Sequence, residues 1–192
     1  MALKIITAPT EEPVTLAEAK AQLRVDWADE DTQINSYILA AREYVEGFQN
    51  RALVTQTWDL WLDGWPCIDR FSMPLPPLQS VTTIKYYDTD NAEATLATTE
   101  YFVDDKSEPG RIVLAYGKSW PSTNLRPANG VAVRFVAGYG LAAAVPQKVK
   151  QAMLLLVTLM YEKRLPVVEG KIVGEVPFAV SSLLWLDRIV PV

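Results

Sequence analysis

Two clusters of acidic side chains have the residue types and spacing that could bind a cation. They are Asp29-Glu30-Asp31 and Asp88-Thr89-Asp90-Asn91, and such oxygen ligands suit Ca²⁺ or Mg²⁺. The second cluster fails the EF-hand pattern, because Glu93 stands at the sixth position of the loop, where glycine is required. Helix capping explains the first cluster and turn chemistry explains the second. We therefore predict no metal site and no cofactor.

Residue types that most enzymes use for nucleophilic or acid–base catalysis are scarce in this chain. There is no histidine, and Cys67 is the single cysteine, which excludes Ser-His-Asp and Cys-His catalysis and any intramolecular disulfide. Gly138-Tyr139-Gly140 is too short for a glycine-rich phosphate loop and is typical of a turn. The 23 acidic residues always allow some carboxylate pair, but the sequence singles none out. We predict that the protein is not an enzyme.

Four tryptophans are the remaining side chains that could form a ligand site, by stacking on a sugar. They are Trp58, Trp61, Trp65 and Trp120. Successive side chains of a strand point to opposite faces, so Trp58 and Trp61 should lie on different faces of a sheet. This favours one in a core and the other at an edge or subunit contact, with a sugar platform as the alternative.

Composition and charge indicate a folded protein that does not hold nucleic acid tightly. Of its 192 residues, 49% are hydrophobic and 21% are charged, as in soluble folded proteins. The net charge of −5 argues against non-specific nucleic-acid binding, which needs clustered Lys and Arg. The longest apolar run, residues 152–161, is roughly half a membrane span, and the first residues lack a secretory signal. We expect a cytosolic protein without a membrane segment.

Two helices are predicted near the N-terminus. Thr15 and Glu18 form a capping-box pattern that starts a short helix over about residues 15–24. A long helix is predicted over about residues 30–49, because apolar residues recur there at three- and four-residue steps.

Two more helices are predicted near the C-terminus. Pro146 is a favoured helix start, and residues 147–164 follow it with apolar side chains on nearly every face. Such a helix must be buried all round, so we expect it to meet the core on one side and another chain on the other. Residues 179–188 are predicted to form a last, short helix.

Between these helix pairs, the chain is rich in β-branched and aromatic residues separated by turn signals, which is typical of antiparallel strands. Strands are predicted at 53–62, 81–87, 101–104, 111–116 and 131–136. Pro109-Gly110 predicts a turn, and therefore a hairpin between the third and fourth strands. The predicted fold class is α+β: a helical core of residues 1–52 and 141–192, beginning with an extended lead over residues 1–13, carries an antiparallel β insertion at 53–140.

A series of short segments in this order and spacing matches a known pattern over nearly the whole chain. They are Leu16–Asp26, Asp29–Ile34, Ala40–Val45, Tyr86–Asp90, Ser107–Ile112, Ser119–Pro121, Val136–Tyr139 and Val145-Pro146. In these segments the chain resembles the head–tail connector, or neck adaptor, proteins of long-tailed phages. The same fold serves phage-like particles, including gene transfer agents.

The resemblance implies a structural role in the virion neck, at the head–tail interface. It implies a ring, dodecameric in the particle, that sits beneath the capsid portal, joins head to tail and lines the DNA exit channel. The implied partners are the portal protein, a stopper or tail-completion protein and further copies of the chain. DNA would be only passing cargo, and no membrane is involved. The chain would be made in the host bacterial cytoplasm, and whether it is a monomer in isolation stays open.

The resemblance also implies where the chain docks on the portal, namely through its C-terminal segment. The predicted docking residues are Phe178, Leu183, Leu184, Trp185, Leu186, Ile189 and Val190. Leu183-Leu184 resembles the family, whereas residues 185–190 depart from its common ending. The predicted subunit or core contacts are Ile34, Ile38, Val45, Met153, Leu156 and Met160. The alternative function is a ligand- or receptor-binding β module on a helical stalk in a virion or tail protein.

Overall fold

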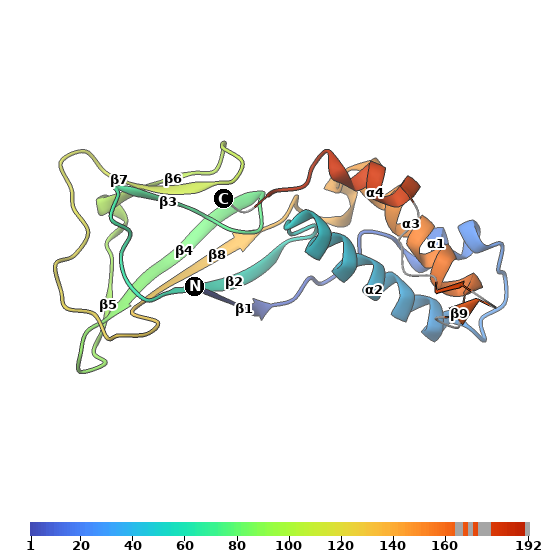
Figure 1. Cartoon of the computed structure of the whole chain (residues 1–192), viewed down its shortest axis with the longest axis horizontal. Coiled ribbons are helices and arrows are strands. Elements are labelled where there is room, and N and C mark those ends of the chain that lie inside the picture. Colours follow the sequence, from blue (N-terminus) through green and yellow to red (C-terminus); the bar gives the residue numbers. More distant parts are fainter. Residues whose placement is uncertain (164–166, 169–170, 173–177, 191–192) are drawn as a thin grey trace. The chain divides into compact units, whose positions relative to one another are not determined.

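The protein, seen in a computed structural model that describes residues 1–163, 167–168, 171–172 and 178–190, divides into two compact units. The β unit consists of Met1–Thr10 and Thr55–Tyr139, and the helical unit consists of Glu11–Val54 and Gly140–Val192. Helices and antiparallel strands both occur (Figure 1), which confirms the predicted α+β class.

The helical unit is formed by segments from both ends of the chain. Its helices are α1 (Leu16–Leu23), α2 (Asp31–Gln49), α3 (Gln147–Glu162) and α4 (Phe178–Trp185), with a 3-10 turn at Ala142–Ala144. A short antiparallel pair, β9 (Val167–Val168) and β10 (Lys171–Ile172), precedes α4. Helix α3 packs against each of the other three helices. The apolar residues that this packing buries include Val14, Ala19, Ile34, Ile38, Val45, Leu53, Val149, Met153, Leu156, Val180 and Leu184.

The two N-terminal helices start in different ways. The capping box predicted for α1 is present: the Thr15 hydroxyl accepts the backbone N–H of Glu18, and the Glu18 carboxylate accepts the backbone N–H of Thr15. The cap expected for α2 is absent, because Glu30 occupies the N-cap position without a side-chain capping bond. Asp31 instead supplies negative charge in the first turn and forms a 2.7 Å ion pair with Lys20.

The β unit contains two antiparallel sheets. The strands of the five-stranded sheet, in spatial order, are β1 (Ala2–Thr7), β2 (Gln56–Leu62), β8 (Val131–Ala137), β4 (Leu78–Tyr87) and β5 (Glu93–Thr95). Those of the three-stranded sheet are β3 (Arg70–Ser72), β7 (Arg111–Leu114) and β6 (Tyr101–Asp104), with a 3-10 turn at Thr98–Glu100. The predicted hairpin is β6–β7, paired from Tyr101 opposite Leu114 to Asp104 opposite Arg111.

Strand β1 is the main departure from the sequence-based outline. Residues 1–13 were expected to be an extended lead within the helical part, but Ala2–Thr7 pairs antiparallel with β2 and belongs to the β unit. The pairing runs from Ala2 opposite Trp61 to Thr7 opposite Thr57. No turn links β1 to β2 in sequence, because α1 and α2 lie between them, so local turn signals could not reveal the pairing.

The two faces of the five-stranded sheet differ in polarity because side chains alternate along each strand. Leu60, Val133 and Ile84 lie in register across β2, β8 and β4, and all three are buried. One residue along, Asp59 is paired with Arg134, which places polar side chains on the opposite face. The buried face contributes to a core that also contains Met73, Leu78, Leu96, Tyr101, Ile112 and Phe135.

Candidate interaction sites

The end of α2 holds the C-terminal segment of the helical unit through polar contacts. The side-chain amide of Gln49 donates to the carbonyl oxygen of Leu184 at 3.0 Å, and that of Asn50 donates to the carbonyl oxygen of Ile189 at 2.8 Å. The backbone N–H of Ile189 donates in turn to the carbonyl oxygen of Gln49 at 2.9 Å. Because the segment takes part in these three bonds only through backbone groups, the contacts fix its path with few demands on its side chains.

Asp187 is fixed in the same region from two sides. Its carbonyl oxygen accepts a 2.5 Å hydrogen bond from Nε of Arg51, and its carboxylate forms a 2.7 Å ion pair with Lys148 of α3. The segment after α4 is thus attached to both α2 and α3.

Residues of this segment divide into buried anchors and exposed apolar side chains. Leu184 and Val180 are at most 1% exposed, whereas Trp185, Leu186 and Val190 are 61%, 82% and 67% exposed. Among the other predicted docking residues, Leu183 and Ile189 are half-buried, and the side chain of Phe178 lies outside the described part of the structure. Leu184 is therefore a core residue of this chain, and its neighbours Trp185 and Leu186 form the accessible apolar surface.

An aromatic cluster extends this surface onto α2. The ring of Phe48 lies 6.5 Å from that of Trp185 and 6.2 Å from that of Tyr44, measured between centroids. The guanidinium of Arg188 lies over both Phe48 and Trp185, at 5.1 and 5.4 Å. No site role was predicted for Phe48, Tyr44 or Arg188. The four-residue spacing of Tyr44 and Phe48 on one helix is the signal that could have linked the first two.

Five of the six predicted subunit or core contacts lie in the core of the helical unit. Ile34, Ile38, Val45, Met153 and Leu156 are at most 2% exposed. Met160 is half-buried, as are its neighbours Leu155 and Leu159. Leu155 and Leu159, one helical turn apart, mark a partly accessible side of α3. Met160 instead follows Met153 and Leu156 along the buried side, close to the end of the helix.

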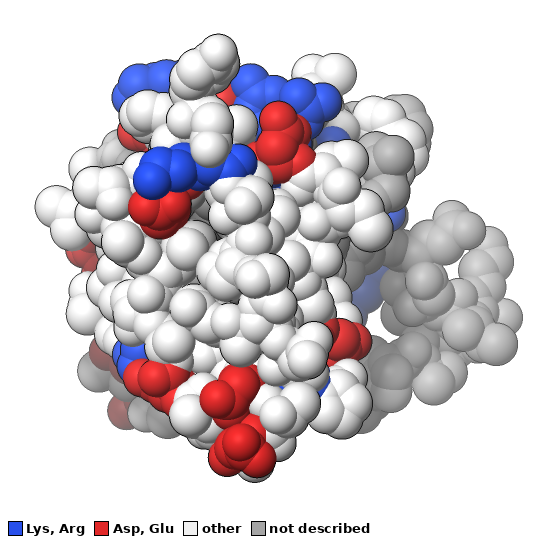
Figure 2. All heavy atoms as spheres, turned by 90° about the vertical axis from the view of Figure 1, so that its left-hand side faces the viewer, with Lys and Arg blue, Asp and Glu red and all other residues white. Residues whose placement is uncertain are grey.

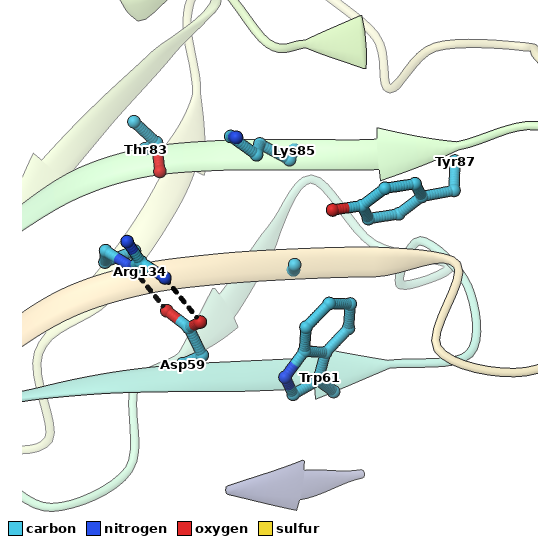
Figure 3. A pocket seen from close by; sticks show the side chains of 7 residues that line it. Asp59, Trp61, Thr83, Lys85, Tyr87 and Arg134 are labelled. Carbon is cyan, nitrogen blue, oxygen red and sulfur yellow. Dashed lines mark hydrogen bonds and ion pairs between the residues drawn. The ribbon is translucent and has the colours of Figure 1, made fainter. Parts of the chain in front are cut away.

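A shallow pocket of about 120 Å³ lies on the polar face of the five-stranded sheet (Figure 3). The Asp59 carboxylate, on a residue only 7% exposed, accepts two hydrogen bonds from Arg134, at 2.7 and 2.8 Å. These bonds raise the pKa of Arg134 above its ordinary value. Trp61 and Tyr87 stack at 6.0 Å, and the Arg126 guanidinium lies 4.2 Å from the Tyr87 ring centroid.

The charged groups beside this pocket neutralise one another. Lys85 forms a 2.7 Å ion pair with Glu93, which also accepts a 2.9 Å hydrogen bond from the Tyr87 hydroxyl. These bonds, first the one from Lys85, lower the pKa of Glu93, and burial is the main reason that the pKa of Tyr87 is raised. Glu93 is thus held as an ionised partner of Lys85 and Tyr87 beside the pocket.

The tryptophans lie largely against other side chains. Trp65 and Trp120 stack at 4.9 Å with an angle of 7° between their planes, and Trp120 also lies 5.7 Å from Phe71. Trp58 is paired with the buried Phe135, whereas Trp61 lines the open pocket, so the two occupy opposite faces as predicted. Trp65 and Trp120 are therefore packed against aromatic side chains, whereas Trp61 borders the pocket.

The acidic clusters have structural roles. The Asp88 carboxylate accepts the backbone N–H groups of Asp90 and Ala92, both at 2.9 Å, as expected for turn chemistry. Within the described residues, no group of three or more His, Cys, Asp or Glu side chains is placed to hold a metal ion. In the same part of the chain, no helix has the length and apolarity needed to cross a membrane.

Charge on the end of the β unit shown in Figure 2 does not form a basic patch. Lys and Arg gather along one side, Asp and Glu gather mainly along the other, and most of the surface between them is uncharged.

Comparison with known proteins shows what this fold is similar to. Residues 13–106 match the family of phage gp6-like head–tail connector proteins. No curated protein matches the chain significantly.

Solved structures of gene transfer agent (GTA) particles contain chains similar to this one over its full length. One, in the virion of a native GTA particle, is 28% identical with a TM-score of 0.82. Others are in the neck of an empty particle computed with C6 symmetry (26% identical, TM-score 0.81) and in the neck of a native particle computed with C12 symmetry (26% identical, TM-score 0.80). Each comparison covers 100% of this chain and 97% of the other. The resemblance to head–tail connector proteins is therefore confirmed in both sequence and fold.

Proposed function

We propose that this chain is a structural head–tail connector that forms a ring beneath the capsid portal, joins head to tail and lines the DNA exit channel. The observation that carries the proposal is the similarity of the whole chain, at 26–28% identity, to chains of GTA particles, including their necks. The proposed role is not enzymatic and needs no cofactor. The proposed partners are the portal protein, a stopper or tail-completion protein and further copies of the chain.

Ring assembly is supported by the symmetry under which the similar necks were solved, sixfold and twelvefold. Cyclic symmetry repeats one contact between neighbouring copies, so a modest apolar patch contributes many times over. The net charge of −5 suits a channel for DNA, because an acidic wall repels the phosphate backbone and lets it pass without adhering.

Docking on the portal is assigned to the exposed apolar side chains that follow Leu184. Trp185, Leu186 and Val190 are each more than half exposed, and Arg188 lies against Trp185. Tryptophan and arginine are enriched among the residues that dominate binding energy at interfaces. We propose that these side chains enter an apolar groove of the portal, while Leu184 anchors the segment in its own core.

Point variants test docking more sharply than truncation does. Deleting residues 177–192 would also remove Leu184 from the core, so lost assembly could reflect unfolding. A Trp185→Ala/Leu186→Asp double variant removes mostly exposed apolar surface, together with the contacts of Trp185 with Phe48 and Arg188. We expect the purified variant to stay folded, with a small drop in melting temperature, while the yield of tailed particles, counted by electron microscopy, falls at least about tenfold.

Leu141→Asp is the matched control, because Leu141 is also apolar, 70% exposed and part of the helical unit. This control should leave the yield of tailed particles unchanged. Normal yields for the double variant would show that docking does not use this surface. Absence of the wild-type chain from purified particles would overturn the connector proposal itself.

A further inference from the structure

Strand β1 leaves one whole edge of the five-stranded sheet open. It is the outermost strand, paired only with β2. Within the described residues, no other backbone or side-chain group bonds to Ala2–Thr7. In an antiparallel edge strand, alternate N–H and C=O groups point away from the sheet, so β1 presents a row of free donors and acceptors.

The side chains of β1 are unusually apolar for an open edge. All six residues are exposed, and three of them have large apolar side chains. Leu3, Ile5 and Ile6 are 38%, 43% and 41% exposed to solvent. Proteins normally protect open edges with charge, proline, a bulge or short strand length. Here the strand carries one charged residue, Lys4, and one irregularity in pairing, between Ile5 and Thr7.

The opposite edge of the same sheet is protected in the usual way. Strand β5 has only three residues, and Glu93 at its start is ion-paired with Lys85. The contrast shows that the open apolar edge at β1 is a local property and does not extend to the whole sheet. An extended apolar edge of this kind is suited to strand addition, in which another chain continues the sheet.

A second open edge of similar character lies on the three-stranded sheet of the same unit. Strand β6 is outermost in that sheet and carries Phe102, which is 66% exposed. The carboxylates of Asp104 and Asp105 at the end of this edge are ion-paired with Arg111 and Lys106, at 2.8 and 3.2 Å, so the charge there is balanced. A head-to-tail contact requires two different patches on one molecule. The β unit supplies such a pair.

We propose that β1 of one copy of this chain adds to the β6 edge of the next copy, so that neighbouring β units are joined by backbone hydrogen bonds. The contact would cover the exposed apolar side chains of Leu3, Ile5 and Phe102. The occupant is a second copy because both open apolar edges belong to one chain and repeat around a cyclic assembly. This inference rests on the proposed ring and specifies one of its contacts.

Photo-crosslinking in assembled particles tests the contact directly. A benzophenone amino acid placed at Leu3 should yield covalent multiples of the 21.4 kDa chain on irradiation, with the crosslinked peptide containing residues 101–104. A crosslink to a different protein, or no crosslink where the same probe at Leu186 reacts, would overturn the inference and leave the connector role intact. Absence of the chain from the particles would overturn both.

Charge variants give an independent measurement. A Leu3→Asp/Ile5→Asp double variant places repulsive charge on the open edge, and Phe102→Asp does so on the receiving edge. Each should lower the yield of tailed particles at least about tenfold, while circular dichroism shows that the purified chain stays folded. Thr95→Asp on the protected strand β5 is the matched control. Yields equal to this control for both variants would refute the pairing.

Discussion

Gln49 and Leu184 are joined by a hydrogen bond from the side-chain Nε2 of the first to the carbonyl oxygen of the second, at 3.0 Å and across 135 positions of sequence. Both residues are fully buried. A buried amide bonded to a backbone carbonyl cannot be removed without leaving that carbonyl unsatisfied. The bond therefore attaches the C-terminal helix α4 to the end of α2.

Gln49→Ala should destabilise the helical unit by about 1–3 kcal/mol, because it leaves the Leu184 carbonyl without this donor and opens a cavity. Urea unfolding followed by circular dichroism would measure the change. Glu43→Ala on the exposed side of α2 is the control and should change stability by less than about 0.5 kcal/mol. A Gln49 variant as stable as the control would mean that water replaces the lost donor.

Truncation to alanine should destabilise the protein strongly at Leu184 and hardly at all at Leu186. Leu184→Ala removes a fully buried side chain and should cost about 2–5 kcal/mol of unfolding free energy, whereas Leu186, at 82% exposure, should cost almost nothing. Thermal unfolding of the two purified variants measures this difference. Equal losses would show that Leu186 is packed in solution and is not available for docking.

Arg134 forms an ion pair with the carboxylate of Asp59, and Asp59 is only 7% exposed. Arg134→Met should destabilise the β unit by about 1–3 kcal/mol, because it leaves this carboxylate largely desolvated and unpaired. Adding Asp59→Asn should recover part of the loss. Denaturant unfolding of the two single variants and the double variant measures the coupling, and additive losses would contradict it.

Asp104 should stay ionised in acid well below its ordinary pKa of 3.8, because hydrogen bonds from the Ser107 hydroxyl and the Arg111 guanidinium lower the pKa of its carboxyl. The folded-state pKa is below the unfolded one, so the contribution to stability is complete above about pH 4 and is lost as pH falls through the folded-state pKa. Ser107→Ala should raise this pKa, as measured by NMR titration. The control variant Ser182→Ala lies in the helical unit and should leave the pKa of Asp104 unchanged. If Asp104 titrated alike in both variants, Ser107 would not be a cause of the lowered pKa.

Sequence patterns were sufficient to predict structural elements whose decisive interactions are local. The capping box of Thr15 and Glu18 and the turn at Pro109-Gly110 each depend on residues within a few positions, and both lead to the elements expected from them. The opposite-face placement of Trp58 and Trp61 follows from the period of a strand.

Features set by distant packing could not be predicted from the sequence. Strand β1 is separated from β2 by two helices, so its pairing has no local signal. The burial of Leu184 beside the exposed Trp185 depends on which side of α4 meets α2 and α3, and two adjacent apolar letters do not reveal this. In the sequence, Arg188 is indistinguishable from an ordinary surface charge. Its position over the ring of Phe48 is set by the packing of the C-terminal segment on α2.

The helical unit combines Glu11–Val54 with residues that follow Gly140, and this arrangement has a consequence for synthesis on the ribosome. The apolar sides of α1 and α2 emerge first, but α3 and α4, which cover them, are translated only after the whole intervening β segment. At about 5–20 residues per second, the early helices wait several seconds for their partners. Since Trp185 ends α4 and Leu186 directly follows it, the same late event that closes this core presents the proposed docking side chains. A nascent chain that stalls before α4 would therefore lack the surface proposed to enter a particle.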